Sequence, residues 1–310
     1  MKYTSIFLFL LFVQATLGQS YIVDMKRESA RSDKLTGGRI EKTLLENGDP
    51  DIKITINVPA FQMTLWQDGK EVKSYPIGVG LLEYPIIISR REASSIEWNP
   101  VWIPPSSDWI ERSSTVKAGE IVLPTDPRNP LGKVKIPIGY GYLIHQAKGP
   151  GDMGSLVSHG CVRVLQADVY DLAEKIVAAR GLDVPAAKIA AAKRNKKTLI
   201  ALIDPVVPVE ITYDTIVVEN GRLNIYPDVY NLKRNNVENV RRELKTSDVD
   251  DDRLTDGQIK RMIAAAVGKK RFVVETRFVE SGRAVESGQV IPVVGVARPI
   301  ANPAVRRRRG

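Results

Sequence analysis

Three alternating segments near residue 50 constrain the fold more than any other feature of this sequence. Residues 52–58 and 61–65 alternate apolar with polar side chains, and Asp68 and Gly69 precede a third run at 72–77. A period of two residues is the pattern of a half-buried β-strand, and Asp-Gly between such runs is typical of a hairpin turn. An α-helix repeats every 3.6 residues and does not present this pattern on one face. We therefore expect a mainly β protein with few helices.

The rest of the chain divides by composition. Residues 84–110 combine prolines with tryptophans, which is typical of a packed loop or of a flap that faces substrate. Apolar residues at helical spacing predict a helix over 169–177, and strands return over 206–218. Beyond that point the chain becomes charged, with weak helical periodicity followed by strand-like runs. These changes indicate a main domain over 51–231 and a small α+β unit over 232–310 that ends in a disordered basic tail.

The N-terminus has the pattern of an export signal. Lys2 gives a positive start, residues 6–13 are unbroken apolar, and small residues follow up to Gly18. This run is too short to span a bilayer as a helix, which needs roughly 20 residues, and a retained anchor is the alternative. We expect residues 1–18 to be a signal peptide and 19–50 a flexible lead-in. The protein is then exported, to the periplasm rather than to a cell wall or the medium, with no transmembrane segment after cleavage.

The net charge is positive, with 45 Lys and Arg against 36 Asp and Glu. An excess of basic residues can favour binding to nucleic acid, to an anionic membrane or to an anionic wall polymer. Export argues against nucleic acid, and no basic stripe is interleaved with aromatic residues as in single-strand binders. We expect a solvated basic surface and no nucleic-acid partner.

All of the histidine and cysteine in the chain falls within one short stretch. The sequence has two His and one Cys, and His145 precedes Cys161 by 16 residues with His159 between them. Glycines and a proline in the intervening segment indicate a loop, which can return Cys161 to the side of His145. A thiol with a pKa of about 8.5 needs a neighbouring base to react near neutral pH, and an imidazole within hydrogen-bond reach supplies one. A single cysteine also excludes an internal disulfide.

Three interpretations fit this cluster. His145 and Cys161 could form a nucleophilic pair. Both histidines and Cys161 could bind zinc with Asp152 as a fourth ligand, although no compact ligand spacing supports a metal site. Cys161 could instead be a small buried hydrophobic residue, with both histidines satisfied in the core. Spacing alone leaves all three open.

The hexapeptide SHGCVR at 158–163, with a histidine upstream, resembles the signature of the L,D-transpeptidase catalytic domain family (YkuD, or ErfK/YbiS/YcfS/YnhG). Segments at 54–80, 99–105 and 208–213 also look like that family, so the resemblance covers roughly residues 50–230. It implies that the main domain is a β-sandwich catalytic domain and that the α+β unit is an appendage.

The resemblance implies a role for each matched residue. Cys161 would be the nucleophile and His145 its base, with the backbone carbonyl of Gln146 orienting the imidazole. His159 and the amides of Gly160 and Cys161 would line the oxyanion region. Gly160 also allows backbone geometry that keeps the approach to the sulfur open. No metal or cofactor is implied.

Three further residues are expected at the substrate. The resemblance implies that Arg163 fixes a substrate carboxylate through its bidentate fork, and a structural ion pair is the alternative role. Tyr142 is expected beside it, and Ser158 is expected chiefly to brace the turn. Residues 86–89 depart from the Thr-Pro-x-Gly pattern that often follows Tyr-Pro in relatives, which puts the geometry of the donor side in question.

The implied function is a peptidoglycan L,D-transpeptidase in cell wall biogenesis. Cys161 would attack the carbonyl between the third residue of a stem tetrapeptide and its terminal D-alanine, releasing D-alanine and leaving a thioester. The amine of a second stem peptide, giving a 3-3 cross-link, or a lipoprotein lysine would then accept the acyl group. The alternatives are an L,D-carboxypeptidase with water as acceptor, a non-catalytic peptidoglycan-binding protein, and a papain-like peptidase. The resemblance also implies that carbapenems acylate Cys161.

Overall fold

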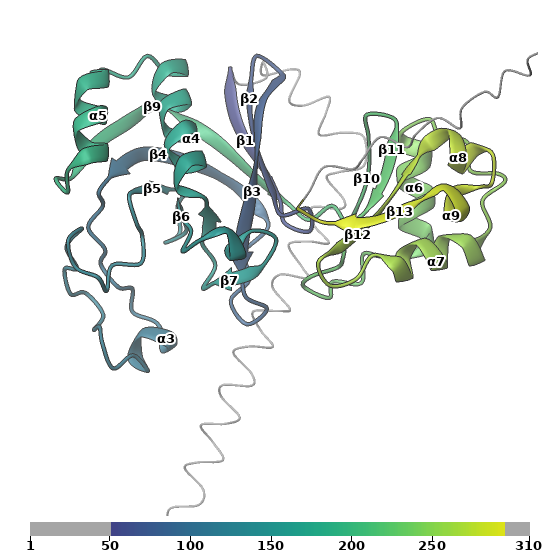
Figure 1. The fold of residues 1–310 in the computed structure, drawn as a ribbon, viewed down its shortest axis with the longest axis horizontal. Coiled ribbons are helices and arrows are strands. Elements are labelled where there is room, and N and C mark those ends of the chain that lie inside the picture. The colour runs from purple at the N-terminus through teal and green to yellow at the C-terminus, as the bar shows by residue number, and fades with distance from the viewer. Residues whose placement is uncertain (1–50, 295–310) are drawn as a thin grey trace, which may run out of the picture. The chain divides into compact units, whose positions relative to one another are not determined.

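The computed structural model describes residues 51–294, which form two compact units (Figure 1). The first unit holds residues 51–214 together with 229–232. The second holds the described residues of 215–228 and 233–294. No helix within the described part of the chain is long and apolar enough to cross a membrane.

Three sequence predictions fall outside the described residues. They are the signal peptide at 1–18, the flexible lead-in at 19–50 and the basic tail beyond residue 294.

The first unit is built on a nine-stranded sheet that closes on itself. The strand order is β2-β1-β9-β4-β5-β6-β8-β3-β7, and β2 also pairs with β3, so the strands enclose a core. In chain order the strands are β1 (Ile52–Asn57), β2 (Gln62–Gln67), β3 (Lys70–Gly80), β4 (Ser89–Trp98), β5 (Val134–Pro137), β6 (Leu143–Gln146), β7 (Leu156–Ser158), β8 (Val162–Val164) and β9 (Leu199–Thr212). The prediction of a mainly β fold with few helices is confirmed.

Burial along β1 follows the same alternation of apolar and polar residues that predicts this strand. Ile52, Ile54 and Ile56 are buried, and the residues between them are half-buried. Strand β1 pairs antiparallel with β2 and parallel with β9. The predicted hairpin turn joins β2 to β3 at Asp68 and Gly69, which have φ of 51° and 70°. Two positive φ angles are what a two-residue hairpin loop of the Asp-Gly type requires.

Three α-helices and one short 3₁₀ helix complete the first unit. They are α3 (Asp108–Glu111), η1 (Pro150–Asp152), α4 (Gln166–Ala179) and α5 (Ala186–Arg194). Helix α4 buries Val169, Leu172, Ala173 and Ile176 on one face and packs on β5 and β6 (Figure 1). This is the helix that the apolar spacing of 169–177 predicts, extended at both ends.

Strand β4 is an element that sequence analysis missed. The sequence predicts a loop over 84–110, yet β4 pairs with β9 along its length. Alternate residues of β4 are indeed buried, but they include Arg91 and Ser95, so no apolar period marks the strand. The long irregular segment of this region follows β4. We call residues 99–131 the flap.

The second unit is a four-stranded antiparallel sheet with helices. Its strand order is β10-β11-β12-β13. Its elements are β10 (Ile216–Glu219), β11 (Arg222–Ile225), α6 (Val237–Thr246), α7 (Asp256–Ala265), β12 (Lys270–Glu275), α8 (Thr276–Glu280), α9 (Ala284–Ser287) and β13 (Gln289–Pro292).

The contact boundary between the units lies before β10. Strand β11 pairs with β12, so the β10–β11 hairpin belongs to the second unit. The sequence analysis placed this hairpin in the main domain, because its distant partner β12 leaves no local signal. Residues 229–232 return to the first unit, where the Tyr230 hydroxyl donates to the Gly80 carbonyl at 3.0 Å and accepts from the Ile86 amide at 3.3 Å.

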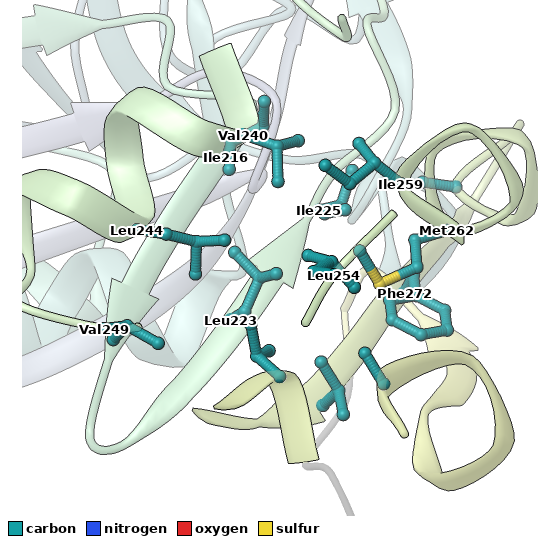
Figure 2. Close-up of a cluster of buried hydrophobic side chains, with 14 residues drawn as sticks. Ile216, Leu223, Ile225, Val240, Leu244, Val249, Leu254, Ile259, Met262 and Phe272 are labelled. Carbon is teal, nitrogen blue, oxygen red and sulfur yellow. The ribbon is translucent and has the colours of Figure 1, made fainter. Parts of the chain in front are cut away.

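Helices α6 and α7 share an apolar core with the small sheet (Figure 2). Val240 and Leu244 from α6 and Ile259 and Met262 from α7 are buried there with Leu223 of β11. Each of these side chains is at most 1% exposed. The second unit therefore has a hydrophobic core of its own.

This core predicts the cost of truncating Leu244. Leu244→Ala removes a fully buried side chain and should lower the free energy of unfolding by about 2–5 kcal/mol. Val267→Ala is the matched control, because Val267 is 60% exposed and should change stability by no more than about 0.5 kcal/mol. Urea denaturation of the full chain measures both. Equal effects of the two substitutions would contradict a packed core at Leu244.

Candidate active site

Strands β6 and β8 lie side by side and run parallel. Their register pairs Ile144 with Val162 and His145 with Arg163. Successive side chains on a strand point to opposite faces, so His145 and Arg163 share one face while Ile144 and Val162 share the other. Ile144 and Val162 are completely buried, which fixes this register from the core side. Cys161 directly precedes Val162 and therefore belongs to the face of His145.

The register makes Cys161 and His145 diagonal neighbours. Continuing the pairing by one residue sets Cys161 opposite Leu143, two positions before His145. Strands about 4.8 Å apart with a rise of about 3.3 Å per residue leave roughly 8 Å between such backbone positions. Two side chains directed to the same face can meet across that distance. Parallel strands need a long crossover, and residues 147–161 supply it through η1 and β7.

The turn before Cys161 is braced from inside by Ser158. The Ser158 hydroxyl donates to the Cys161 carbonyl oxygen at 2.5 Å and accepts from the Gly160 amide at 3.2 Å. Ser158 is only 2% exposed, so it supports the turn instead of presenting a hydroxyl to solvent. The Gly160 amide, expected to face an oxyanion, thus already has an acceptor within the turn.

Position 160 requires a glycine for two reasons, its backbone conformation and the closeness of a neighbouring side chain. Its φ is +107°, a region that residues with a side chain rarely adopt. A Cβ atom at this position would lie 2.4 Å from Cε1 of Tyr142. The Tyr142 ring therefore packs directly against the Gly160 backbone, and the Arg91 guanidinium also lies over this ring, 4.5 Å from its centroid.

His145 is an uncharged base at neutral pH. It is 4% exposed, and burial, helped by the positive charge of Arg163, lowers its pKa to about 4. The backbone carbonyls of Gln146 and Leu131 act in the opposite direction. Its Nδ1 is buried and has no hydrogen-bond partner among the described residues. A buried polar atom without a partner is unusual and marks a position that a reacting group can fill.

The Gln146 side chain is engaged away from the imidazole. Its Oε1 accepts from the Lys133 amide at 2.8 Å, and its side chain packs against Gly132. Only the main chain of Gln146 acts on His145.

Cys161 is the one cysteine of the chain and is partly exposed. Burial raises the pKa of its thiol, whereas the Leu143 backbone and the positive charge of Arg163 act to lower it. The thiol and the imidazole are thus both neutral near pH 7. The site at rest is a neutral pair, not a thiolate beside an imidazolium.

Arg163 is held in an ion pair. It is 8% exposed, and its Nη1 lies 3.4 Å from Oδ2 of Asp152, which also accepts from the Lys148 amide at 2.9 Å. This geometry fits the structural ion pair that the sequence left open as an alternative. Asp152 is also the fourth ligand in the zinc interpretation of the sequence. Within residues 51–294, no group of three or more His, Cys, Asp or Glu side chains is arranged to hold a metal ion.

His159 contacts two aromatic residues that sequence reasoning did not assign to the site. The Trp109 ring stacks on it with centroids 4.2 Å apart and planes at 12°, and the Tyr84 ring lies at 4.7 Å and 59°. Trp109 belongs to α3 in the flap. The cluster of tryptophans and prolines was the available signal, since a flap facing substrate was one of its two interpretations.

The flap also reaches the strand beside Cys161. Leu143, the neighbour of Cys161 in register, packs against a small core within the flap. That core consists of Trp102, Ile110, Val116, Val122 and Leu131. The structure thus brings the predicted residues into one region of the first unit, with the flap as an added component.

Comparison with known proteins gives a family match and several partial relatives. The YkuD L,D-transpeptidase catalytic domain matches residues 51–211. The probable L,D-transpeptidase YbiS of Escherichia coli K12 is 32% identical over 130 residues, which cover 40% of this chain and 41% of YbiS. The probable L,D-transpeptidase ErfK/SrfK of Salmonella typhimurium is 30% identical over 129 residues, with 40% of each covered. The chain thus spans about two fifths of the length of these curated relatives.

Solved structures show a weaker likeness. An L,D-transpeptidase from Mycobacterium smegmatis aligns with a TM-score of 0.35 and 15% identity, covering 52% of this chain and 58% of that one. LdtMt1 in complex with imipenem aligns with a TM-score of 0.34 and 14% identity, covering 52% and 59%. Likenesses at this level carry no assignment of function.

The low pKa of His145 predicts how stability depends on pH. An exposed histidine titrates near 6.5 and His145 in the folded protein near 4, so between these values only the unfolded chain binds the proton. This contribution to stability is complete above pH 6.5 and falls as the pH drops, by about 3 kcal/mol at pH 4. Urea titrations at neutral pH and at pH 4 should show this loss in the wild type and not in His145→Gln. The same pH dependence in both proteins would contradict the low pKa.

The geometry of Gly160 predicts a strong effect of one methyl group. Gly160→Ala should cost about 1–3 kcal/mol of stability through backbone strain alone, and more through contact with Tyr142. It should also slow alkylation of Cys161, because the turn that carries the thiol must shift. Adding Tyr142→Ala removes the contact but not the strain, so the double variant should recover only part of the loss. Complete recovery would show that φ at 160 is unimportant.

Proposed function

The chain belongs to the L,D-transpeptidase catalytic domain family, and from this premise we propose that it is an exported peptidoglycan L,D-transpeptidase with Cys161 as nucleophile and His145 as base. The observation that carries the proposal is the β6–β8 register, which sets the only thiol and a buried imidazole on one face as diagonal neighbours. The unpartnered Nδ1 of His145 is the atom that accepts the thiol proton.

The first step is acylation of the sulfur. Cys161 Sγ attacks the carbonyl that joins the third residue of a stem tetrapeptide to its terminal D-alanine, and the thiol proton passes to His145. Because the thiol pKa is raised and the imidazole pKa is low, the proton moves during the attack and not before it. Efficient general-base catalysis of this kind needs the base within hydrogen-bond reach of the proton it takes.

The surrounding groups stabilise the negative charge that develops. The positive charge of Arg163 and the Leu143 backbone both favour the thiolate over the thiol. Main-chain amides near the turn, that of Cys161 among them, would receive the oxyanion. Arg163 acts from within its ion pair with Asp152, and Ser158 and Tyr142 hold the turn that carries the sulfur.

Acylation ends when His145 passes the proton to the leaving amine, so D-alanine departs and the acyl group remains on Cys161 as a thioester. The second step resolves this thioester, with His145 taking a proton from the attacking group and returning one to the sulfur. The amine of a second stem peptide or of a lipoprotein lysine then attacks the thioester, which forms a new amide bond and regenerates the thiol. Water in place of the amine gives carboxypeptidase activity. The chemistry needs no metal or organic cofactor, because acid, base and nucleophile are all side chains.

Location follows from the same proposal. Peptidoglycan stem peptides lie outside the cytoplasm, which agrees with a signal peptide at 1–18 and a periplasmic protein. We propose that the first unit, residues 51–214 with 229–232, is the catalytic domain and that the second unit is an appendage.

The test is the reaction of the full mature chain with disaccharide tetrapeptides, followed by mass spectrometry. Loss of D-alanine with formation of a cross-linked dimer is the expected result, and trimmed tripeptide alone would indicate the carboxypeptidase. Cys161→Ala should abolish both products, and His145→Asn should slow them by about 10²–10⁴-fold. Wall binding without any change of substrate mass, equal in wild type and Cys161→Ala, would favour the non-catalytic binding protein instead.

A carbapenem provides an independent check of the nucleophile. Meropenem should add once per chain to the folded wild type, and Cys161→Ala should remain unmodified in intact-protein mass spectra. Absence of the adduct on folded wild type would count against acylation at Cys161.

A further inference from the structure

A hydrogen-bonded triangle lies at the base of the aromatic stack on His159. The Tyr84 hydroxyl donates to Oδ2 of Asp108 at 3.0 Å. Nη2 of Arg112 donates to the Tyr84 hydroxyl at 2.9 Å and to the same Asp108 oxygen at 3.1 Å. Burial and the neighbouring carboxylate of Asp108 raise the pKa of Tyr84, so its hydroxyl keeps the proton that it donates. Each member of the triangle thus contacts the other two.

The triangle joins the flap to the strand framework. Asp108 and Trp109 are consecutive residues of α3, and Arg112 ends that helix. Tyr84 lies on the other side, just after β3, where its amide donates to the Leu81 carbonyl at 3.1 Å. One side of the flap is therefore tied to the chain segment that follows β3.

Both rings that contact His159 are joined to the triangle, because Tyr84 is a member of it and Trp109 follows Asp108 in α3. Trp109 stacks on the imidazole, and the Tyr84 ring lies tilted against it. The segment after β3 is also tied to the turn itself, because the Leu81 amide donates to the Ser158 carbonyl at 2.8 Å. A Cβ on Gly80 would lie 3.0 Å from the Gly160 Cα, so the two backbones are in contact.

We propose that Tyr84, Asp108 and Arg112 form a latch that holds α3 and Trp109 against His159 and so fixes the flap beside Cys161. These three are positioning residues, which act through Trp109 and His159 and not on the reacting atoms. The role in substrate placement rests on the proposed transpeptidase function. The latch itself concerns only the position of the flap, so it can be tested whether or not the chain has that function.

The latch explains why the flap can be irregular and still have a defined position. Between its ends the flap contains only the short helix α3 and one isolated bridge, between Trp102 and Val122. A long irregular loop needs contacts of its own to stay in place. The flap core provides contact at Leu143, and the latch provides the second attachment at His159. The two attachments, at Leu143 and at His159, together fix the orientation of the flap.

The first test uses the accessibility of the only thiol in the chain. Tyr84→Phe, Asp108→Asn and Arg112→Gln each remove one corner of the triangle, and Tyr84→Phe keeps the ring. In each variant the rate of Cys161 alkylation by a bulky maleimide should rise severalfold relative to that by iodoacetamide. The ratio of the two rates isolates steric access from the intrinsic reactivity of the thiol.

The second test follows the stacking of Trp109 on His159 by tryptophan fluorescence. A protonated imidazole quenches the fluorescence of an indole stacked on it, so Trp109 should brighten as His159 loses its proton. Burial lowers the pKa of His159, with the charges of Arg163, Asp108 and Arg112 also acting on it. The fluorescence step therefore falls below pH 6.5. Trp109→Phe and His159→Gln should abolish the step, and the three latch variants should reduce its amplitude.

Arg90→Gln is the matched control. Arg90 is 57% exposed and pairs with Glu210, whereas Arg112 is 61% exposed and pairs with Asp108, so both substitutions remove one exposed arginine from one ion pair. The control should retain the wild-type alkylation ratio, fluorescence step and activity. Circular dichroism melts confirm that each variant is folded.

Activity on tetrapeptide separates the latch from the proposed reaction. Latch variants should lower kcat/KM by about tenfold or more, mainly through KM, because a displaced flap misplaces the substrate. If the wild type is inactive but the alkylation ratio and the fluorescence step change as expected, the latch stands and the transpeptidase proposal does not. If both readouts in all three latch variants match those of Arg90→Gln, the latch is refuted.

Discussion

The site depends on the pairing of two very short parallel strands, β6 and β8. The two buried side chains of Ile144 and Val162 fix that pairing from the core. A slip of β8 by one residue would turn the side chain at 161 toward the core, away from the face that His145 occupies, because side chains alternate between faces. The relation between thiol and imidazole is thus determined by apolar residues on the opposite side of the sheet. Helix α4 packs on β6, the strand that carries Ile144 and His145.

The same low-polarity environment acts on both titrating groups and keeps both uncharged. It raises the pKa of Cys161 and lowers that of His145. Arg163 favours the thiolate but disfavours the imidazolium, so its charge alone would not produce an ion pair between them. Asp152, paired with Arg163, moderates this charge. Such a site holds its lone cysteine as the neutral thiol, and this protects it, since the thiolate is the form that oxidants attack.

Local signals in the sequence were enough for the first strands, for helix α4 and for the cluster of His145 with Cys161. A period of two, a period of 3.6 and the rarity of His and Cys can all be read within a few residues. The missed features depend on distant partners. Arg91 is buried at a position where an apolar residue would have marked β4, so this strand has no apolar period. The β10–β11 hairpin is assigned to its unit by pairing with the distant strand β12. The stack on His159 combines Tyr84 with a residue of the flap. No pattern within any one of these segments specifies the others.

The return of residues 229–232 to the first unit has a consequence for how the chain can be divided. Because the β10–β11 hairpin precedes this return and the remaining strands follow it, the two units are interleaved along the sequence. The chain passes from one unit to the other three times, after residues 214, 228 and 232, so no single cut in the polypeptide separates the two units.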